Sequence, residues 1–463
     1  MSEQIDILIQ HGLLVTVDRE RRIITDGAVA VRGDRIVEVG KTEALKEKYE
    51  GKKVIDASER VVLPGLIDSH FHVSNEGPKG YLADDVPAWD WMTDVVPRIN
   101  ASMTPEDEYL LSLAILIECV KTGTTTAFEA GTTKHPAQLV RAMEEIGIRG
   151  VVGKFTWDQV KEPAILRSST KEALENAEKV IKAHHGQANG RISAWVSLLG
   201  CGTMSDELLA GAKDLADRLG VGLNFHQSTV TREVEEFVAL NGKRPIEYFA
   251  DLGVLDRNVH LIHMVDVSDR EVDLLAEHDV KIVNCTATGL SLGYGLTSLG
   301  KFPEMIDKGV CVALGCDGAN CSNYFDMVRV MYLAAGLYTD ARTERSLIPG
   351  EKAIEMGTID GARAMLMEDE IGSLEAGKKA DIILFDRRRP EWVPMLNVVN
   401  NLVYSADGKS VDTVIIDGEI VVEGGKLMTL DEFAVYDAME KVDWARIIED
   451  RTGIPLKTRW PVI

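Results

Sequence analysis

The run Leu63-Pro-Gly-Leu-Ile-Asp-Ser-His-Phe-His72 carries the strongest indication of the fold. It is apolar and bounded by turn-forming residues, which is typical of a buried β-strand. Side chains two positions apart on a strand point to the same face, so His70 and His72 are expected to converge at the strand's end. One cation could then bind a ring nitrogen of each. Histidine pairs also arise by chance, so the interpretation depends on the rest of the chain.

Three more residues of metal-ligand type end apolar runs further along. These runs are Gly222-Leu-Asn-Phe-His226, His260-Leu-Ile-His263 and Val312-Ala-Leu-Gly-Cys-Asp317. Three imidazoles and one carboxylate suit zinc or another divalent transition metal and leave room for water. A lone histidine on an apolar strand is more often a core residue, but five ligand-type residues at strand ends favour a metal-dependent enzyme. We expect one divalent ion per chain, with zinc first and iron, cobalt and manganese left open.

The middle of the chain alternates between strand-like and helical stretches. Amphipathic helices are predicted between most strands, for example from Thr104, the expected N-cap, to Val120. Eight strands alternating with helices predict an α/β fold, a distorted (β/α)8 TIM barrel, whose working groups lie at the C-terminal strand ends. The expected strands are 63–72, 124–130, 147–155, 191–200, 220–227, 258–265, 280–287 and 310–317.

Both ends of the chain have the sequence pattern of short strands separated by turns. Gly27-Ala-Val-Ala-Val31 and Ala380-Asp-Ile-Ile-Leu-Phe-Asp386 are examples. We therefore expect residues 1–62 and 373–430 to form one small composite β-sandwich. The barrel would occupy residues 63–372, and residues 431–463 would form a C-terminal helical extension.

Charge and composition exclude several classes of partner. The 463 residues carry a formal net charge of −23, which disfavours binding to nucleic acid or to an anionic membrane. The longest uncharged stretch, 282–300, is rich in Gly, Ser and Thr and does not resemble a membrane span. Six cysteines without a Cys-x-x-Cys motif, and no visible signal peptide, suggest a cytoplasmic protein with reduced thiols. A small-molecule substrate is the expected partner.

With these motifs the chain resembles the amidohydrolase superfamily nearly from end to end. The resemblance rests on the run 63–72, Gly123-Thr-Thr-Thr126, the strand-end histidines, Ala313-Leu-Gly-Cys-Asp-Gly318 and the segment 371–383. Within the superfamily it is similar to the triazine-hydrolase and cytosine-deaminase-like branch, including atrazine chlorohydrolases and the molinate and phenylurea hydrolases. This resemblance alone implies a homo-oligomer.

The resemblance also implies roles for the strand-end residues. His70, His72, His226 and Asp317 would hold the metal. His263 would hydrogen-bond the substrate oxygen or the attacking water, and Asp317 would pass a proton from water to the leaving group. A second metal bridged by a carboxylated Lys154 is the less favoured alternative. Related barrels that have lost their metal ligands serve as scaffold proteins, but all five ligand-type residues are present here.

The chain departs from the deaminases of this branch after the strand-5 histidine. Those enzymes carry a Glu three residues later, whereas this chain has His226-Gln-Ser-Thr229. Many relatives also have His-x-Pro at strand 7, where this chain has Asn284-Cys-Thr. A hydroxyl is too weak an acid to protonate a ring nitrogen. We therefore expect hydrolysis of an amide, urea, carbamate or thiocarbamate bond in a small apolar or aryl molecule, as in xenobiotic degradation.

The alternative function is deamination or dechlorination of an N-heterocycle, for which Glu76, Glu129 and Glu233 remain candidate proton carriers. Aromatic side chains near the barrel mouth suit an aryl substrate, although core packing would explain them equally well. The expected substrate contacts are Trp89, Trp91, Lys154, Trp157, Thr229, Asn284 and Asn320.

Overall fold

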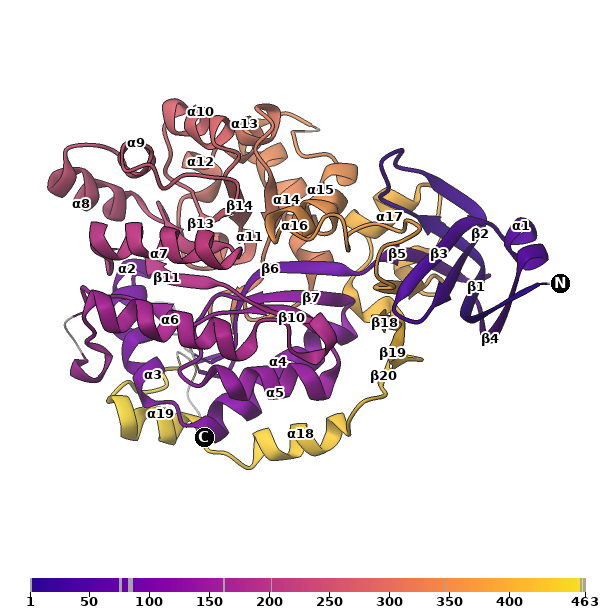
Figure 1. The fold of residues 1–463 in the computed structure, drawn as a ribbon, viewed down its shortest axis with the longest axis horizontal. Helices are drawn as coiled ribbons and strands as arrows, with labels where there is room; N and C mark the ends of the chain where they lie inside the picture. The colour runs from indigo at the N-terminus through magenta and orange to yellow at the C-terminus, as the bar shows by residue number, and fades with distance from the viewer. Residues whose placement is uncertain are drawn as a thin grey trace.

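The computed structural model describes residues 2–74, 77–81, 86–160, 163–200, 202–345, 347–458 and 460. In Figure 1 a barrel of parallel strands is surrounded by helices, and a β-sheet that contains the N-terminus lies at one end of it. The predicted fold, a distorted TIM barrel with a β-sandwich built from both termini, is confirmed.

Two parallel sheets form the barrel wall within the described residues. Their strand orders are β10-β8-β7-β6-β16 and β15-β14-β13-β12-β11-β9. Three of the runs predicted as single strands are broken in two, and each contributes one piece to each sheet. The strands are β6 (Leu66–His72), β7 (Thr124–Glu129), β8 (Arg149–Val152), β9 (Phe155–Thr156), β10 (Ile192–Ala194), β11 (Val196–Gly200), β12 (Leu223–Gln227), β13 (Val259–His263), β14 (Lys281–Asn284), β15 (Val312–Leu314) and β16 (Asp317–Gly318).

Close approach of a neighbouring strand accompanies two of these breaks. A Cβ at Gly153, between β8 and β9, would collide with Ser197 of β11, and a Cβ at Gly315, between β15 and β16, would lie 2.7 Å from the carbonyl oxygen of His70. Only glycine fits at these positions. The run 63–72 is likewise two strands, because the Gly65 amide donates to the Asp381 carbonyl (2.9 Å) and directs β5 (Arg60–Pro64) into the terminal sheet.

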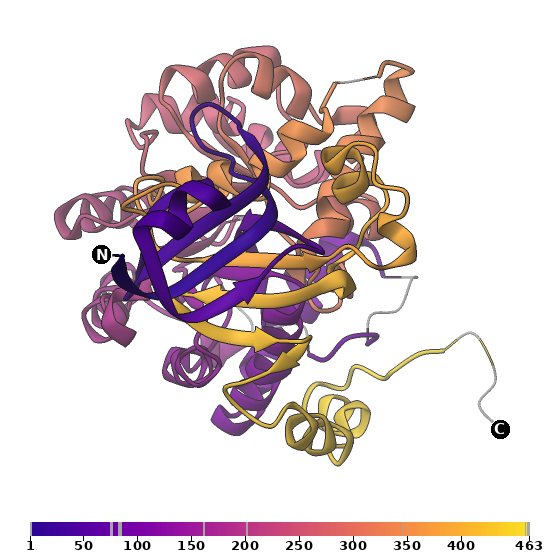
Figure 2. The same cartoon turned by 90° about the vertical axis from the view of Figure 1, so that its right-hand side faces the viewer.

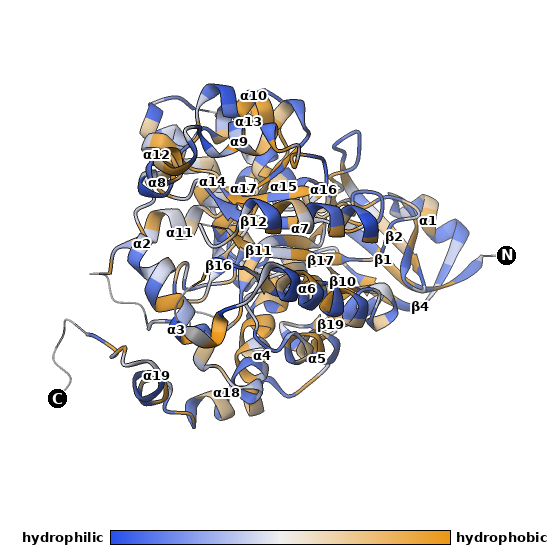
Figure 3. Ribbon diagram, turned by 60° about the vertical axis from the view of Figure 1, so that its left-hand side comes forward, coloured by the Kyte–Doolittle hydropathy of each residue, from blue (hydrophilic) through white to orange (hydrophobic). Residues whose placement is uncertain are grey.

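The helices between the strands begin where the sequence indicates. Thr104 and Asp107 form a capping box at the start of α4, as Ser268 and Glu271 do for α10. In Figure 3 α6 presents mainly hydrophilic residues on its visible face. The helices that cover the barrel are α4 (Pro105–Lys121), α5 (Pro136–Ile146), α6 (Thr170–His184), α7 (Asp206–Leu219), α8 (Thr231–Asn241), α9 (Pro245–Asp251), α10 (Asp269–Glu277), α13 (Phe302–Asp307), α14 (Met327–Arg342), α15 (Gly350–Met356) and α16 (Ile359–Ala364).

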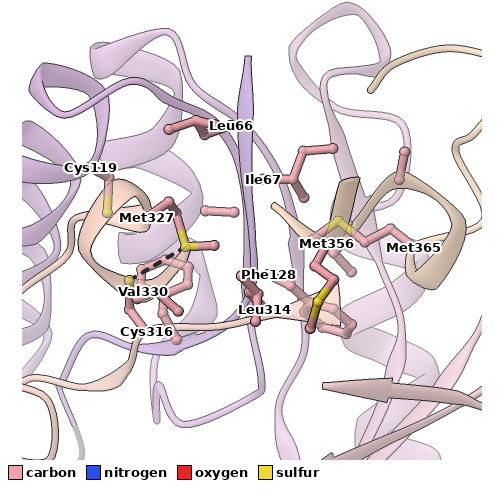
Figure 4. Close-up of a cluster of buried hydrophobic side chains, with 14 of the residues drawn as sticks. Leu66, Ile67, Cys119, Phe128, Leu314, Cys316, Met327, Val330, Met356 and Met365 are labelled. Carbon is pink, nitrogen blue, oxygen red and sulfur yellow. Dashed lines mark hydrogen bonds between the residues drawn. The ribbon is translucent and has the colours of Figure 1, made fainter. Parts of the chain in front are cut away.

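Strand β6 has apolar packing on both sides. Figure 4 shows Leu66 directed toward Cys119 and Met327, whereas its neighbour Ile67 points to the opposite side, toward Met356. Both residues are fully buried. The strand that carries His70 and His72 is therefore held rigidly between two apolar layers.

Strands from both termini form one sheet, as Figure 2 shows with its indigo and yellow strands side by side. Its order within the described residues is β20-β19-β18-β17-β5-β1-β2-β3, with β4 also paired to β1. The antiparallel pair β5 and β17 joins the two halves of the chain. The strands are β1 (Glu3–Val15), β2 (Ile23–Arg32), β3 (Arg35–Lys41), β4 (Tyr49–Asp56), β5, β17 (Ile382–Asp386), β18 (Val411–Ile416), β19 (Glu419–Glu423) and β20 (Lys426–Leu427).

A buried ion-pair network connects this sheet to the barrel. The Arg149 guanidinium, on β8, donates to Asp381 (2.8 Å) and to Asp417 (2.6 Å), and all three side chains are buried. Burial alone would lower the pKa of Arg149, but the two carboxylates raise it above its ordinary value.

After β20 the chain returns along the barrel. Helix α18 (Glu432–Glu440) packs on α4, and α19 (Trp444–Thr452) packs on α3 (Val96–Ser102), as Figure 1 shows. Across the residues that the structure describes, no helix is long and apolar enough to cross a membrane.

Candidate active site

Three histidines from two strands meet at the C-terminal end of the barrel. His70 and His72 end β6, and His226 lies at the end of β12. The Nε2 atoms of His70 and His226 are 3.2 Å apart, and the three side chains offer nitrogens that all lie within 4.8 Å of one another. All three are buried.

Asp317 joins this group from β16, the strand that pairs with β6. Its Oδ1 lies 3.5 Å from Nε2 of His70 and 3.2 Å from Nε2 of His72, and its Oδ2 lies 3.8 Å from Nε2 of His263. His263, at the end of β13, is the fourth imidazole of the cluster. The structure thus brings together all five of the predicted strand-end residues.

Backbone contacts orient the ligands. Nδ1 of His226 lies 2.8 Å from the carbonyl oxygen of Leu199, so this nitrogen carries the proton and Nε2 keeps its lone pair for a metal. On the other side of the cluster, the Asp68 carboxylate accepts hydrogen bonds from the amides of Cys316 (3.0 Å) and His70 (3.3 Å). Asp68 thereby holds β6 against the segment that presents Asp317.

Burial sets the protonation of the cluster. It lowers the pKa of His70, His226 and His263 to about 3, so these imidazoles are neutral near pH 7. Burial alone would raise the pKa of Asp317, but hydrogen bonds with His70 and His72 hold it well below its ordinary value. Neutral imidazoles with free lone pairs and an ionised carboxylate are the donor set that a divalent transition metal requires, so these residues fit such an ion.

The cluster forms the floor of a cavity of about 460 Å³. This volume lies within the usual range of small-molecule sites, roughly 300–1,000 Å³. The residues that line it are His72, Trp91, Met92, Thr93, Val96, Pro97, Phe155, Gln159, Val160, Leu199, Gly202, Thr203, His226, His263, Tyr294, Asp317 and Cys321.

Trp91 is the only predicted substrate contact that lines this cavity among the described residues. Trp89 instead lies beside α8, where the Arg232 guanidinium is 6.0 Å from its ring centre. Lys154 and Trp157 line a separate cavity of about 240 Å³. There Lys154 donates to the Lys134 carbonyl (3.2 Å), and the Trp157 indole donates to the Leu166 carbonyl.

The other three predicted contacts are buried and are not among the described residues that line this cavity. Thr229 is fully buried and donates its amide to Glu233 (2.7 Å). Asn284 is buried at the end of β14, and Asn320 accepts a hydrogen bond from the Tyr81 amide (2.6 Å). Their contact with a substrate stays a prediction.

None of the candidate proton carriers is among the described residues that line the cavity. Glu233 accepts hydrogen bonds from the Gln227 side chain (2.9 Å) and from the amides of Ser228 (3.1 Å) and Thr229, so it organises the loop after β12. Glu129 accepts the amides of Gly131 (2.8 Å) and Thr132 (3.1 Å). Glu76 lies outside the described residues. Asp317 is the one carboxylate in the described lining.

Sequence reasoning missed two aromatic walls of the cavity. The Phe155 ring lies 5.8 Å from that of His226, and the Tyr294 ring lies 5.3 Å from that of His263. Phe155 begins β9, just after the break in the run predicted as the strand 147–155, and Tyr294 lies in the long connection after β14. No motif in the sequence marks either residue.

A (β/α)8 barrel with three imidazoles and one carboxylate at its strand ends has the architecture of a metal-dependent hydrolase. The model of the amidohydrolase family matches residues 61–421, and an imidazolonepropionase-like composite domain of bacteria matches residues 27–49. The chain belongs to the amidohydrolase family. It is a metal-dependent hydrolase that acts on carbon–nitrogen bonds other than peptide bonds.

Curated relatives cover nearly the whole chain. A 5-methylthioadenosine/S-adenosylhomocysteine deaminase of Caldanaerobacter subterraneus is 34% identical over 436 residues, which is 94% of this chain and 97% of the relative. A 5'-deoxyadenosine deaminase of Methanobrevibacter smithii is 33% identical, with the same coverage of both chains.

Solved structures agree on the fold. An adenosine deaminase of Xanthomonas campestris with bound zinc superposes with a TM-score of 0.90 at 25% identity, over 97% of this chain and all of that chain. An atrazine chlorohydrolase of Arthrobacter aurescens complexed with zinc has a TM-score of 0.86 at 21% identity, over 96% of this chain and all of that one. The predicted resemblance to the triazine hydrolases is confirmed at the level of the fold.

Proposed function

We propose that this protein is a hydrolytic deaminase of an aminated N-heterocycle, with an adenine nucleoside as the first substrate to test. The observation that carries the proposal is the aromatic cavity above the His70, His72, His226 and Asp317 cluster. The names of the curated relatives, at 34% and 33% identity, support the same chemistry. This reverses the expectation drawn from Thr229, which favoured amides and ureas.

The cavity suits a flat ring. Trp91, Phe155 and Tyr294 all line it, and aromatic side chains pack favourably against planar heterocycles. The cavity lies directly above the cluster, so an amino-bearing ring carbon would face Asp317 and His263.

The chain's own residues then perform the proton transfers. His70, His72, His226 and Asp317 would hold a divalent ion, and the chemistry that such an ion supplies is a lowering of the pKa of a water molecule to near 7. Asp317 would take the two protons of the attacking water in turn, passing the first to the ring nitrogen as the water oxygen bonds to carbon and the second to the amino group as it leaves as ammonia. His263 is buried, and its Nε2 lies 3.8 Å from Oδ2 of Asp317. It would donate a hydrogen bond to the substrate atom on which negative charge develops as water adds. We propose one ion per chain, with zinc the first candidate.

Thr229 supports a second candidate, hydrolysis of a urea, carbamate or thiocarbamate. A ring nitrogen must gain a proton as water adds, and the Thr229 hydroxyl cannot supply it. A carbonyl substrate needs no such proton, because Asp317 can protonate its leaving amine. In this case the aromatic walls would bind an aryl group.

The test compares the two substrate classes on the zinc-loaded protein. Ammonia release would be measured from adenosine, 5'-deoxyadenosine and 5'-methylthioadenosine, and amine release from an N-aryl urea and a thiocarbamate. We expect kcat/KM for a nucleoside to exceed that for either carbonyl compound at least tenfold. His72→Ala serves as the blank. Faster cleavage of the urea or thiocarbamate would replace the proposal with the second candidate.

Thr229→Glu refines the comparison. If the missing proton donor limits deamination, this variant should raise kcat on the preferred nucleoside about tenfold or more, since a positioned general acid contributes roughly 10²–10⁴-fold. Thr229→Gln, similar in size but without an acid, is the matched control and should not. A gain in both variants, or in neither, would show that ring protonation does not depend on this position.

A further inference from the structure

The roof of the catalytic cavity consists of three short helical pieces. They are α2 (Ala88–Asp90), a π-helical turn (Trp91–Val95) and α3 (Val96–Ser102). Trp91, Met92, Thr93, Val96 and Pro97 of these pieces line the cavity. Helices much shorter than about 12 residues are marginal on their own, so tertiary contacts must hold this roof in place.

Helix α19 supplies such contacts from the far end of the chain. Ile448 is fully buried in an apolar cluster that also contains Trp91, Val96 and Ile99. Trp444 packs against the same cluster. One apolar cluster is therefore shared between the cavity roof and the C-terminal segment.

Polar contacts also connect the roof and the residues that flank it to the C-terminal segment. The Arg98 guanidinium donates to the carbonyl of Thr452 (3.1 Å), and the Tyr81 hydroxyl donates to that of Ile454 (2.5 Å). The Arg451 guanidinium donates to the Ser102 carbonyl (3.2 Å) and pairs with Asp107 (2.5 Å). Arg451 thus links the last residue of α3 to the first turn of α4.

The roof is also anchored to the barrel on its opposite side, where Lys134 Nζ donates to the carbonyls of Ala101 (3.0 Å) and Met103 (3.3 Å). The Asn100 side chain donates to the Thr132 carbonyl, and the Tyr294 hydroxyl lies 4.0 Å from the Met92 sulfur. Arg232 of α8 lies 3.7 Å from Asp90 in a pair that is more than half exposed and therefore weak. The buried and charged contacts of α19 make it a principal support of the roof.

We propose that α19 positions the roof of the catalytic cavity, with Ile448 and Arg451 as positioning residues that act through Trp91 and its neighbours. Neither residue lines the cavity. Removing either one should loosen the roof and weaken substrate binding while the proton-transfer groups stay in place. The proposal uses the cavity assigned under the proposed function, but its main test requires no substrate.

Hydrogen–deuterium exchange of the full-length protein tests the proposal. In Ile448→Ala and in Arg451→Ala, exchange of amides in residues 88–103 should accelerate about tenfold, whereas amides of β12 and β13 should keep the wild-type rate. Arg446→Ala is the matched control, because Arg446 lies on the same helix, is 77% exposed and pairs within the helix with Asp450 (3.5 Å). It should leave the roof unchanged.

Kinetics provide the second measurement, with the best nucleoside or carbonyl compound from the substrate comparison. KM should rise about tenfold in Arg451→Ala with kcat within twofold of wild type, and Arg451→Lys should recover part of the loss. If Ile448→Ala does not fold, Arg451→Ala still tests the proposal, because the Arg451 side chain is 32% exposed and its removal leaves the core intact. Wild-type exchange over residues 88–103 in Arg451→Ala would overturn the proposal, whatever the substrate is.

Discussion

His263 differs from the other histidines of the cluster in its backbone. Its φ of 75° turns the chain out of β13, and its ring faces Oδ2 of Asp317 and the Tyr294 ring. His70 belongs both to the group with His72 and His226 and to a group with His263 and Asp317.

We predict that His263→Asn keeps its metal but loses about 10²-fold in kcat, the scale of one lost electrostatic donor. His72→Ala should lose both the metal and the activity, because it removes a ligand. Elemental analysis of the purified variants, beside steady-state kinetics, separates the two effects. Loss of the metal from His263→Asn would make His263 a ligand.

His260 makes the protein sensitive to acid. It is buried on β13, with its ring centre 5.2 Å from that of Phe128, and burial lowers its pKa to about 3. Between pH 6.5 and 3 the unfolded chain binds a proton at this histidine that the folded protein does not, so stability falls as the pH falls.

We predict that His260→Leu removes about 1.4 kcal/mol of the loss in unfolding free energy between pH 7.5 and 5.5, as one pKa unit implies. Urea unfolding of the metal-free protein at both pH values measures it. Phe128→Leu perturbs the same packing without a titrating group and should keep the wild-type pH dependence. An identical pH dependence in His260→Leu would contradict the assignment.

The five strand-end residues could be predicted because each lies at the end of an apolar run, and this pattern is visible in the sequence alone. The sequence could not predict Phe155, which lines the cavity from the short strand β9, or Tyr294, which lines it from the connection after β14. Nor could it predict that the Leu199 carbonyl orients His226, because a residue of any type can supply a backbone carbonyl. Thr229 is the opposite case. The sequence shows which residue stands there, but its distance from a substrate depends on the conformation of the buried loop that Glu233 holds.

At the scale of elements, the boundary between β15 and β16 determines how closely Asp317 approaches β6. A Cβ at Gly315 would lie 2.7 Å from the His70 carbonyl oxygen and 2.9 Å from the His70 Cβ. The sequence predicted a strand over 310–317 but not its break, because a run of apolar residues carries no information on how near a neighbouring backbone lies. The same limit applies to the break between β8 and β9, where a Cβ at Gly153 would meet Ser197.

We predict that Gly315→Ala separates β6 from Asp317 and lowers metal content at least tenfold while the protein stays folded. Metal titration and far-ultraviolet circular dichroism measure the two properties. Gly336→Ala on α14 is the control, because open space surrounds that position, and it should stabilise the protein by about 0.5–1 kcal/mol. Normal metal affinity in Gly315→Ala would mean that the strands tolerate the added methyl group.

At the scale of the whole molecule, the barrel and the terminal sheet share the Arg149 network. Arg149→Met leaves the buried Asp381 carboxylate without its cationic partner and Asp417 with Lys379 alone (3.4 Å), so we predict a loss of about 3–5 kcal/mol in unfolding free energy. Arg60→Met, which breaks 25%-exposed ion pairs in the same sheet, should cost under about 1 kcal/mol. Denaturant unfolding measures both, and equal losses would refute a special role for burial.

The division into a sandwich of 1–62 and 373–430, a barrel of 63–372 and an extension from 431 stays a prediction.

The pairing of β5 with β17 has a consequence for synthesis on the ribosome. Strands β1 to β5 and the entire barrel wall emerge first, while β17 follows more than 300 residues after β5. During that interval the open edge of β5 presents unpaired amides and carbonyls, the kind of edge that recruits foreign strands. A nascent chain stalled before residue 382 would therefore depend on chaperones, and the last strands to leave the exit tunnel would release it from them.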